Sequence, residues 1–276
     1  KKQNEAFLEL KKELSKEKIF IRKISELNKK DLIYLREYFQ ETIYPIITPT
    51  AIDPSHPFPF IPNKGQAILL RMSRIKKKRE LNAIIVIPRA LPKFISLNNS
   101  ETINEFVTVD DVICKFANEI FPDHNIEASL QFKIIRDSEI EIDDEAADLV
   151  RYFEKAIKKR RRGNVVKLEV LTNSNKNLLN FISKKFKMDE DHIYEVEGLV
   201  GIQDIDEICK KKDPKLRFKK FNPREVERLK EFDDKFFSAI RSKDFVVHHP
   251  FETFDVVIQF LEAAAKDPKV IGIKQT

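Results

Sequence analysis

Glycine is scarce in this chain, and its scarcity excludes several folds at once. The 276 residues contain five glycines, whereas an average usage of about 7% would give about 19. None of them stands in the GxGxxG frame of a dinucleotide-binding fold or in the GxxxxGK[ST] frame of a phosphate loop. Both motifs need glycine because the backbone must approach a phosphate closely. A Rossmann fingerprint and a Walker phosphate loop are therefore excluded.

The remaining composition is that of a globular, weakly basic protein. Apolar residues make up 42% of the chain, which is enough for a sizeable core. Lys and Arg total 51 against 45 Asp and Glu, and the net charge of +6 permits an anionic partner without requiring one. Cys114 and Cys209 lie far apart and form no CxxC pair, so neither a zinc ribbon nor a disulfide scaffold is expected.

No targeting or membrane-spanning segment is evident. No apolar run approaches the ~20 residues that a membrane span requires, and the N-terminus lacks the apolar region of a signal peptide. We therefore expect a cytoplasmic protein, with peripheral association at the inner membrane face as the alternative. The first residue is not Met, which suggests a fragment of a longer protein.

The periodicity of apolar residues predicts a mixture of helices and short strands. Residues 2–40 are expected to be helical because apolar side chains recur at spacings of three and four. Residues 43–63 contain six prolines, and since proline fixes φ and lacks an N–H, no helix or inner strand should cross them. An ordered extended loop is expected there instead, because the segment has apolar side chains that can be buried. They are Ile46, Ile47, Phe58, Phe60 and Ile61.

An α+β domain should follow this loop. Strands are predicted at 67–72, 83–87, 130–135, 165–171 and 193–196, and helices at 110–121, 143–159 and 175–186. In the strand at 165–171, Val166, Leu168 and Val170 should face the core, opposite Lys167 and Glu169.

A domain boundary is predicted at 214–223, a basic segment that is bounded by prolines and lacks periodicity. Beyond it we expect a helix at 224–240, a strand at 244–247, a helix at 254–265 and a strand at 270–274. This order is the start of a βαβ unit. One such unit cannot complete a sheet, so the second domain is expected to be truncated, with a Phe-rich face exposed over 231–260.

Two neighbouring histidines, His248 and His249, are the first candidate site. They follow the predicted strand at 244–247 and precede a helix start. The carboxyl end of a strand facing a helix N-terminus is where α/β folds place ligands and where phosphate is favoured, and histidine can act as a ligand, base or phosphate carrier. The alternative is that one ring packs and the other is solvated, and the local sequence leaves both open.

The basic connector and one lysine form further candidates. Lys215 and Arg217, with the two lysines that follow, alternate with aromatic residues. Such alternation can hold a phosphate chain or a single-stranded nucleic acid, or the aromatic rings can simply anchor a linker, and the sequence favours neither. Lys274 lies near the end of a predicted buried strand, where an ammonium needs a partner or a pocket.

Two charged runs have more ordinary explanations. The bases at 158–162 could bind a polyanion, but a helix end that complements its own dipole is favoured. The acids at 137–145 do not match the EF-hand pattern, and a strand end leading to a helix N-terminus is favoured over a metal site. Nothing resembles a Ser/His/Asp or Cys/His arrangement or a pair of facing catalytic carboxylates.

Several segments resemble, in order, the histidine-phosphorylating bacterial polyphosphate kinases. They are YPIITPT at 44–50, HPFPF at 56–60, RRRG at 160–163, DFVVHHP at 244–250 and DPKVIGIKQT at 267–276. The resemblance runs over nearly the whole chain. It implies reversible transfer of the ATP γ-phosphate to inorganic polyphosphate through a phosphohistidine, with Mg²⁺.

The resemblance also implies a domain map and a fold class. Residues 1–42 would be the helical tail of an N-terminal domain, 43–220 a head domain used in dimerisation, and 221–276 the beginning of the first of two phospholipase D-like catalytic domains. The expected fold is therefore α+β, with a head domain of mixed helices and short strands, a helical segment before it and a truncated α/β start after it.

No catalytic or metal-binding residue of the family carries over to this chain. The family's phosphorylated histidine and metal-associated arginines lie downstream, and an ATP-contacting Asn lies upstream. The residues expected to contact substrate are His248, His249, Arg217, Lys215 and Lys274. Mg²⁺ and ATP would belong to the parent enzyme.

The expected partners are inorganic polyphosphate and ATP or ADP, with a homo-oligomer formed through the head domain and no nucleic acid. On this interpretation the chain alone is inactive. The alternative is a stand-alone polyanion-binding or oligomerisation module. A third interpretation, a nucleic-acid-binding protein, rests only on the basic runs.

Overall fold

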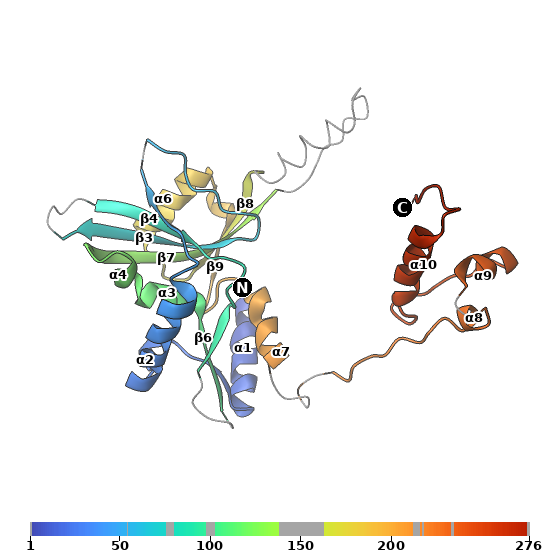
Figure 1. The fold of residues 1–276 in the computed structure, drawn as a ribbon. Helices are drawn as coiled ribbons and strands as arrows, with labels where there is room; N and C mark the ends of the chain where they lie inside the picture. The colour runs from blue at the N-terminus through green and yellow to red at the C-terminus, as the bar shows by residue number, and fades with distance from the viewer. Residues whose placement is uncertain are drawn as a thin grey trace. The chain divides into compact units, whose positions relative to one another are not determined.

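The computed structural model describes residues 2–53, 55–75, 80–97, 103–137, 163–211, 216, 218–232 and 235–274. The chain divides into two compact units, Lys1–Lys212 and Asp213–Thr276, which are described one at a time. The helix predicted at 143–159 and the basic run at 158–162 lie outside the described residues, as does nearly all of the acidic run at 137–145. The fold class is α+β, as expected (Figure 1).

A six-stranded sheet with the order β2-β4-β3-β7-β8-β9 forms the centre of the first unit. In that order its strands are Pro49–Ile52, Glu80–Val86, Gln66–Arg74, His124–Arg136, Val165–Leu171 and Ile193–Val196. Neighbouring strands are antiparallel except β8 and β9, which are parallel. The five strands predicted after the proline-rich loop are all confirmed.

Helix α6 (Lys176–Phe186) connects the parallel pair β8 and β9. The Asn175 side chain accepts hydrogen bonds from the backbone N–H groups of Asn177 and Leu178, which caps the helix N-terminus. Lys187 at the C-cap is left-handed, with φ 55°. The predicted helix at 175–186 is therefore confirmed, with its first residue serving as the cap.

A second, three-stranded sheet was not expected from the sequence. Its order is β1-β6-β5, and its strands are Ile19–Ile21, Asn104–Thr108 and Phe94–Leu97. The prediction of continuous helix over 2–40 is therefore wrong: α1 (Lys2–Lys16) ends before β1, and η1 (Ile24–Glu26), α2 (Lys29–Tyr38) and the π-helix η2 (Phe39–Ile43) follow. The parallel pairing of β1 with β6, a strand distant in sequence, overrides the local helical pattern.

The proline-rich segment contains the edge strand β2, which begins at Pro49, so no inner strand crosses it. Ile47 and Ile61 are buried, as expected, whereas Ile46 and Phe60 are exposed.

Arg136 holds the end of the proline-rich segment. Its Nε donates to the Ile61 carbonyl at 2.8 Å, its Nη1 donates to the Gly163 carbonyl at 2.8 Å, and its guanidinium lies 5.0 Å from the Phe60 ring centre.

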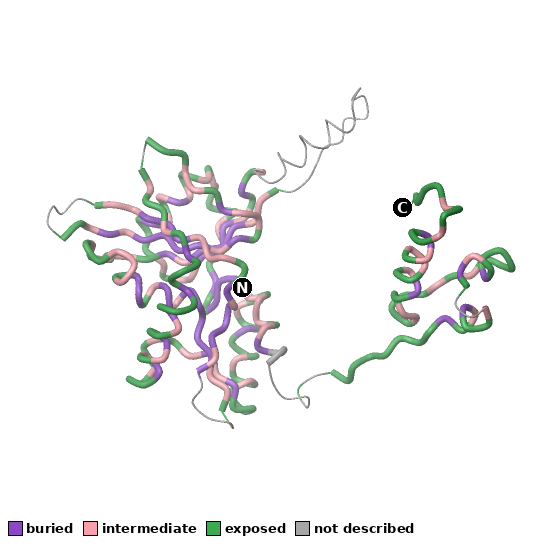
Figure 2. The backbone as a smooth tube through the Cα atoms, viewed as in Figure 1, coloured by how far each residue is buried: buried purple, intermediate pink, exposed green. Residues whose placement is uncertain are grey.

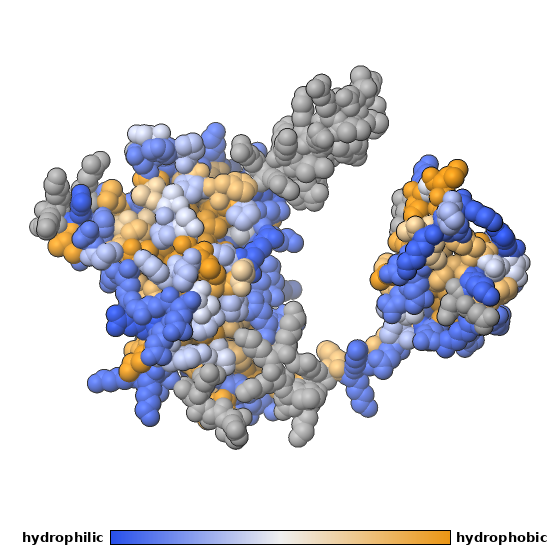
Figure 3. Space-filling view, in the orientation of Figure 1, coloured by the Kyte–Doolittle hydropathy of each residue, from blue (hydrophilic) through white to orange (hydrophobic). Residues whose placement is uncertain are grey.

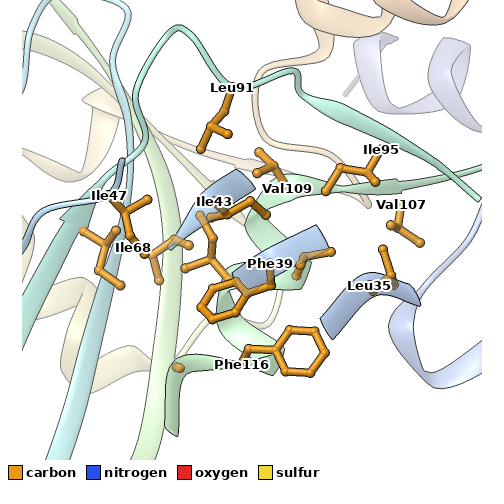
Figure 4. Packing of buried hydrophobic residues seen from close by; sticks show 14 of the residues in the cluster. Leu35, Phe39, Ile43, Ile47, Ile68, Leu91, Ile95, Val107, Val109 and Phe116 are labelled. Atoms are coloured by element: carbon orange, nitrogen blue, oxygen red, sulfur yellow. The ribbon is translucent and has the colours of Figure 1, made fainter. Parts of the chain in front are cut away.

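Two hydrophobic cores lie on opposite faces of the large sheet, and α2 and α3 (Val109–Lys115) lie on one side with α6 on the other (Figure 1). Successive side chains of β3 alternate between these cores, with Ile68 in the first and Leu69 in the second. Figure 4 shows Ile68 beside Phe39 and Ile43, which come from η2. The second core receives Leu178 and Ile182 from α6.

The remaining elements of this unit are short. The predicted helix at 110–121 is split into α3 and α4 (Ala117–Ile120), since Phe116 between them leaves the helical conformation. Two 3-10 turns, η3 (Glu190–His192) and η4 (Ile202–Ile205), precede β9 and α7 (Asp206–Lys211) respectively. A third core, which joins α1 and α7 to the small sheet, contains Phe7, Ile19, Ile21, Phe94, Phe106, Leu199 and Ile208. Figure 2 shows the buried residues concentrated along the strands of this unit.

The second unit is helical within its described residues. Its helices are α8 (Glu227–Lys230), α9 (Phe236–Ser242) and α10 (Asp255–Lys266). The predicted helix at 254–265 is confirmed as α10, while the single helix predicted at 224–240 is two short ones. The strands predicted at 244–247 and 270–274 are wrong, because no described segment pairs with either one, and a strand needs such a partner for its backbone groups.

Apolar side chains are exposed on this second unit, as expected for 231–260. Phe251 and Phe254 are 53% and 58% exposed, and Ile258 is 47% exposed. By contrast Phe236 is buried, in a small core with Val226, Leu229, Ala239 and Val256. Figure 3 shows hydrophobic residues on the surface of this unit.

Candidate functional site

The two histidines lie on an irregular turn before α10, and both are exposed. Glu252 organises this turn. The His248 backbone N–H donates to its Oε2 at 2.8 Å, and His249 Nδ1 lies 2.9 Å from its carbonyl oxygen. The Arg224 Nη2 lies 3.0 Å from Glu252 Oε1. The turn is thus held by an ion pair and by backbone hydrogen bonds, and not by a strand end.

Electrostatics around this turn favour an ionised Glu252. The hydrogen bond from the His248 backbone, with the positive charge of Arg224, lowers the pKa of the Glu252 carboxyl from its ordinary 4.5. The two imidazole rings contact exposed aromatic rings: His248 lies 5.0 Å from Phe251 and His249 lies 5.1 Å from Phe254, centre to centre. Both imidazoles remain accessible to a ligand from solvent.

The other predicted substrate contacts are Lys215, Arg217 and Lys274. Lys215 and Arg217 lie outside the described residues. Further along the connector, the Phe221 ring contacts Phe251 edge-on at 6.1 Å, so an aromatic residue of the connector reaches the histidine turn. Lys274 is exposed on an irregular segment, and the expectation that it stands in a buried strand is wrong.

A buried polar row in the first unit was missed by the sequence analysis. Gln66 of β3, Lys133 of β7 and Glu169 of β8 are register partners across three neighbouring strands. Lys133 is 4% exposed and Glu169 is 7% exposed. The prediction that Glu169 faces away from the core is therefore wrong, and Val166, expected in the core, is 43% exposed.

The segment that begins at Gly201 covers this row. The Gly201 N–H donates to Glu169 Oε1 at 2.6 Å, and Gln66 Nε2 donates to Asp204 Oδ2 at 2.7 Å. Gly201 has φ 76°, and a Cβ there would lie 2.3 Å from Gln66 Nε2. Only glycine satisfies both the left-handed backbone and this close approach.

A second buried lysine extends the row toward the small sheet. Lys93 is paired with Asp110 of α3, and its Nζ also donates to Gln66 Oε1 at 2.7 Å. Glu207 of α7 accepts from the backbone N–H of Lys93 at 2.7 Å and from that of Phe94 at 3.3 Å. The charged groups of Lys93 and Asp110 are 95% or more buried, and mutual pairing offsets the loss of water.

A cavity of about 280 Å³ opens beside this cluster. Four cationic side chains and two carboxylates line it: Lys64, Arg89, Lys93, Lys133, Asp204 and Glu207. Burial lowers the pKa of Lys133, and the charges of Asp204 and Glu169 only partly oppose that shift. A close assembly of polar groups thus lies in the first unit, among residues that the sequence analysis did not single out. Lys133 and Glu169 alternate with apolar residues in β7 and β8, as solvent-facing charges do, so the sequence carries no signal that marks them as buried.

The Cys114 thiol is not activated, and the described residues include no cluster of metal ligands. Burial raises the pKa of Cys114 to about 12, so its thiol stays protonated. Among the residues that the structure describes, no group of three or more His, Cys, Asp or Glu side chains could hold a metal ion. The described helices include none that is long and apolar enough to cross a membrane.

Comparison with known proteins gives two family matches, in order along the chain. The family described as "Polyphosphate kinase middle domain" matches residues 30–208. The family described as "Polyphosphate kinase C-terminal domain 1" matches residues 235–276.

Individual relatives and a solved structure agree with these matches. A polyphosphate kinase of Erythrobacter litoralis is 40% identical over 242 residues, covering 88% of this chain and 33% of the relative. One of Aphanizomenon baltica is 34% identical and covers 100% of this chain and 78% of the relative. The crystal structure of polyphosphate kinase from Porphyromonas gingivalis has a TM-score of 0.65 at 21% identity, covering 97% of this chain and 39% of that one. The chain thus spans about a third of the length of several relatives that it matches.

Proposed function

Because the chain belongs to the polyphosphate kinase family, we propose that it is part of an enzyme that reversibly transfers the ATP γ-phosphate to inorganic polyphosphate. The observation that carries this proposal is the ordered match of a middle domain and a first C-terminal domain over most of the chain. The partners on this proposal are polyphosphate and ATP or ADP, and residues 43–220 would form the head domain that supports a homo-oligomer.

The transfer would proceed through a phosphohistidine that residues 1–276 do not supply. A covalent intermediate divides the transfer between two crowded anions into two steps, each with only one of them bound. His248 and His249 are assigned to substrate binding, since both imidazoles are exposed and can donate hydrogen bonds to phosphate oxygens.

Cationic groups must offset charge on both substrates during such a transfer. The proposed contacts in this chain are Lys215 and Arg217 of the connector, the histidine turn and Lys274. Mg²⁺, which would arrive with ATP, supplies charge neutralisation on the phosphates. We assign it no ligand in this chain.

Labelling with ATP tests the assignment directly. After incubation of this chain with Mg²⁺ and ATP labelled at the γ-phosphate, we expect no acid-labile phosphate on the protein. A longer polyphosphate kinase that includes the downstream histidine serves as the positive control. Acid-labile label on the 276-residue chain would place a nucleophile within it, overturn the assignment, and make His248→Ala and His249→Ala the first variants to test.

Binding separates this proposal from that of a nucleic-acid-binding protein. The chain should bind polyphosphate with an affinity that falls as salt rises, since phosphate contacts release counterions. Neutralising Lys215 and Arg217 together to Gln should lower that affinity and reduce the salt dependence. Salt-dependent binding to RNA that polyphosphate cannot displace would favour the nucleic-acid interpretation instead.

A further inference from the structure

The Lys133 side chain is nearly buried, and its ammonium has no hydrogen-bond acceptor among the described residues. Its side chain is 5% exposed, and its ion-pair partner, Asp204 Oδ2, lies 3.7 Å from Nζ, beyond hydrogen-bond distance. Among the residues that the structure describes, no acceptor takes a hydrogen bond from its Nζ, although an ammonium has three N–H donors. Because the Nζ itself is not fully buried, its N–H donors are open to an acceptor that enters from outside the chain.

The cavity of about 280 Å³ is where this acceptor would sit, because Lys133 lines it. A water molecule takes about 30 Å³ in the liquid, so the space exceeds that of a single water and suits a small polyatomic ligand. Lys93 also lines the cavity from the interior side, while Lys64 and Arg89 are exposed and lie at the solvent side.

Two of the cationic side chains that line the cavity have N–H donors free for a ligand. Glu207 already accepts from two backbone N–H groups, and Asp204 accepts from Gln66. Arg89 uses one terminal nitrogen on the Asn63 carbonyl at 2.7 Å, which leaves its other N–H groups for a ligand. Each carboxylate is thus held by the fold through one of its oxygens, Glu207 Oε2 and Asp204 Oδ2, whereas Lys133 and Arg89 retain donors.

We propose that this cavity binds an oxyanion of the phosphate class, with Lys133 at its base and Arg89 and Lys64 at its mouth. Charge-assisted hydrogen bonds from Lys and Arg to a phosphate oxygen are among the strong ones in proteins. The ligand is either free orthophosphate or the end of a polyphosphate chain, whose remaining units would leave past the two exposed cations. The site is formed by residues of the first unit alone and does not depend on the transfer reaction proposed above.

Calorimetric titration of the whole 276-residue chain with orthophosphate, tripolyphosphate and chloride tests the proposal. We expect saturable one-site binding of at least one of the two phosphates and none of chloride. Arg89→Gln should weaken binding about tenfold, since it removes charge-assisted bonds at an exposed position. The matched control is Lys12→Gln, an exposed lysine of α1, which should leave the affinity unchanged.

The base of the site is tested by the double variant K133M/D204N, which removes a cation and an anion together and leaves the formal charge balanced. It should abolish the binding while thermal unfolding shows that the protein is still folded. Should this variant fail to fold, acylation of Lys133 in the unmodified protein, followed by peptide mass spectrometry, gives a second readout. Phosphate should slow acylation at Lys133 and not at Lys12.

The two phosphates identify the source of the ligand. Binding of orthophosphate alone indicates free phosphate, and tighter binding of tripolyphosphate that long-chain polyphosphate displaces indicates a chain end. The absence of saturable binding overturns the proposal, as does binding that R89Q leaves unchanged or acylation at Lys133 that neither phosphate slows. None of these results bears on phosphoryl transfer, which the labelling experiment reads separately.

Discussion

Replacing Gly201 by Ala should destabilise the first unit more than its backbone angle alone predicts. The residue has φ 76°, and an added Cβ would lie 2.3 Å from Gln66 Nε2 and 2.9 Å from Asp204 Oδ2. The methyl group must therefore displace the hydrogen bond between Gln66 and Asp204, which is 2.7 Å long and has a charged acceptor.

The expected magnitude follows from three contributions. A left-handed backbone costs an L-residue about 1–2 kcal/mol, and loss of a hydrogen bond to a charged group costs about 1.5–3 kcal/mol. Reduced freedom of the unfolded chain offsets about 0.4–1 kcal/mol. The free energy of unfolding should thus fall by about 2–4 kcal/mol, which at a urea dependence of about 2–3 kcal/mol/M lowers the midpoint by about 1 M.

Gly198 provides the matched control. It has φ 77°, but a Cβ there would meet only the edge of the Phe7 ring, at 3.2 Å. Gly198→Ala should therefore cost about 0.5–1 kcal/mol, the backbone contribution less the unfolded-chain offset. Urea unfolding of both variants, followed by circular dichroism, measures the difference. Equal losses at Gly198 and Gly201 would refute the reasoning that the polar row excludes a side chain at Gly201.

Three further predictions concern other parts of the molecule. Arg136→Lys keeps the charge but loses the two carbonyl contacts, and should lower the free energy of unfolding by about 2 kcal/mol, measured by thermal denaturation. The folded-state pKa of Glu252 is lowered below 4.5. The ionised carboxylate therefore stabilises the second unit above pH 4.5, and this stabilisation is lost as the pH falls through the lowered pKa. Glu252→Gln should flatten the dependence of the melting temperature on pH in melts recorded from pH 6 to pH 2. The Cys114 thiol, with a pKa of about 12, should resist iodoacetamide at pH 8 until the protein is unfolded, as peptide mass spectrometry can show.

Elements whose signal is contained in a short window could be predicted from the sequence. The strands β3 and β8 are runs of apolar and β-branched residues, and α6 has both an apolar face and an Asn cap. Strands β1, β5 and β6 could not be predicted, because each is short and is stabilised by partners elsewhere in the chain; Ile19 pairs with Asn104, for example. Local windows carry no information about such pairing.

The two candidate sites also differ in how much of each could be predicted from the sequence. The histidine pair is visible as a motif, but Glu252 and Arg224, which hold its turn, were not recognised because their contacts arise from the fold of the second unit. The buried cluster is the clearer case. Lys133 and Glu169 are ordinary charged residues in the sequence, and only the register of β7 against β8 makes them partners in the interior.

The sequence by itself determined the family, the α+β class and the order of most elements, because these depend on motifs and on hydrophobic periodicity. Only the tertiary structure decided which charged side chains are removed from water. Burial depends on strand register and on which segment covers a sheet face, and both are set by residues far apart in the chain. Gly201 covers Glu169 and brings Asp204 toward Lys133, and that placement creates a polar cavity that no local pattern indicates.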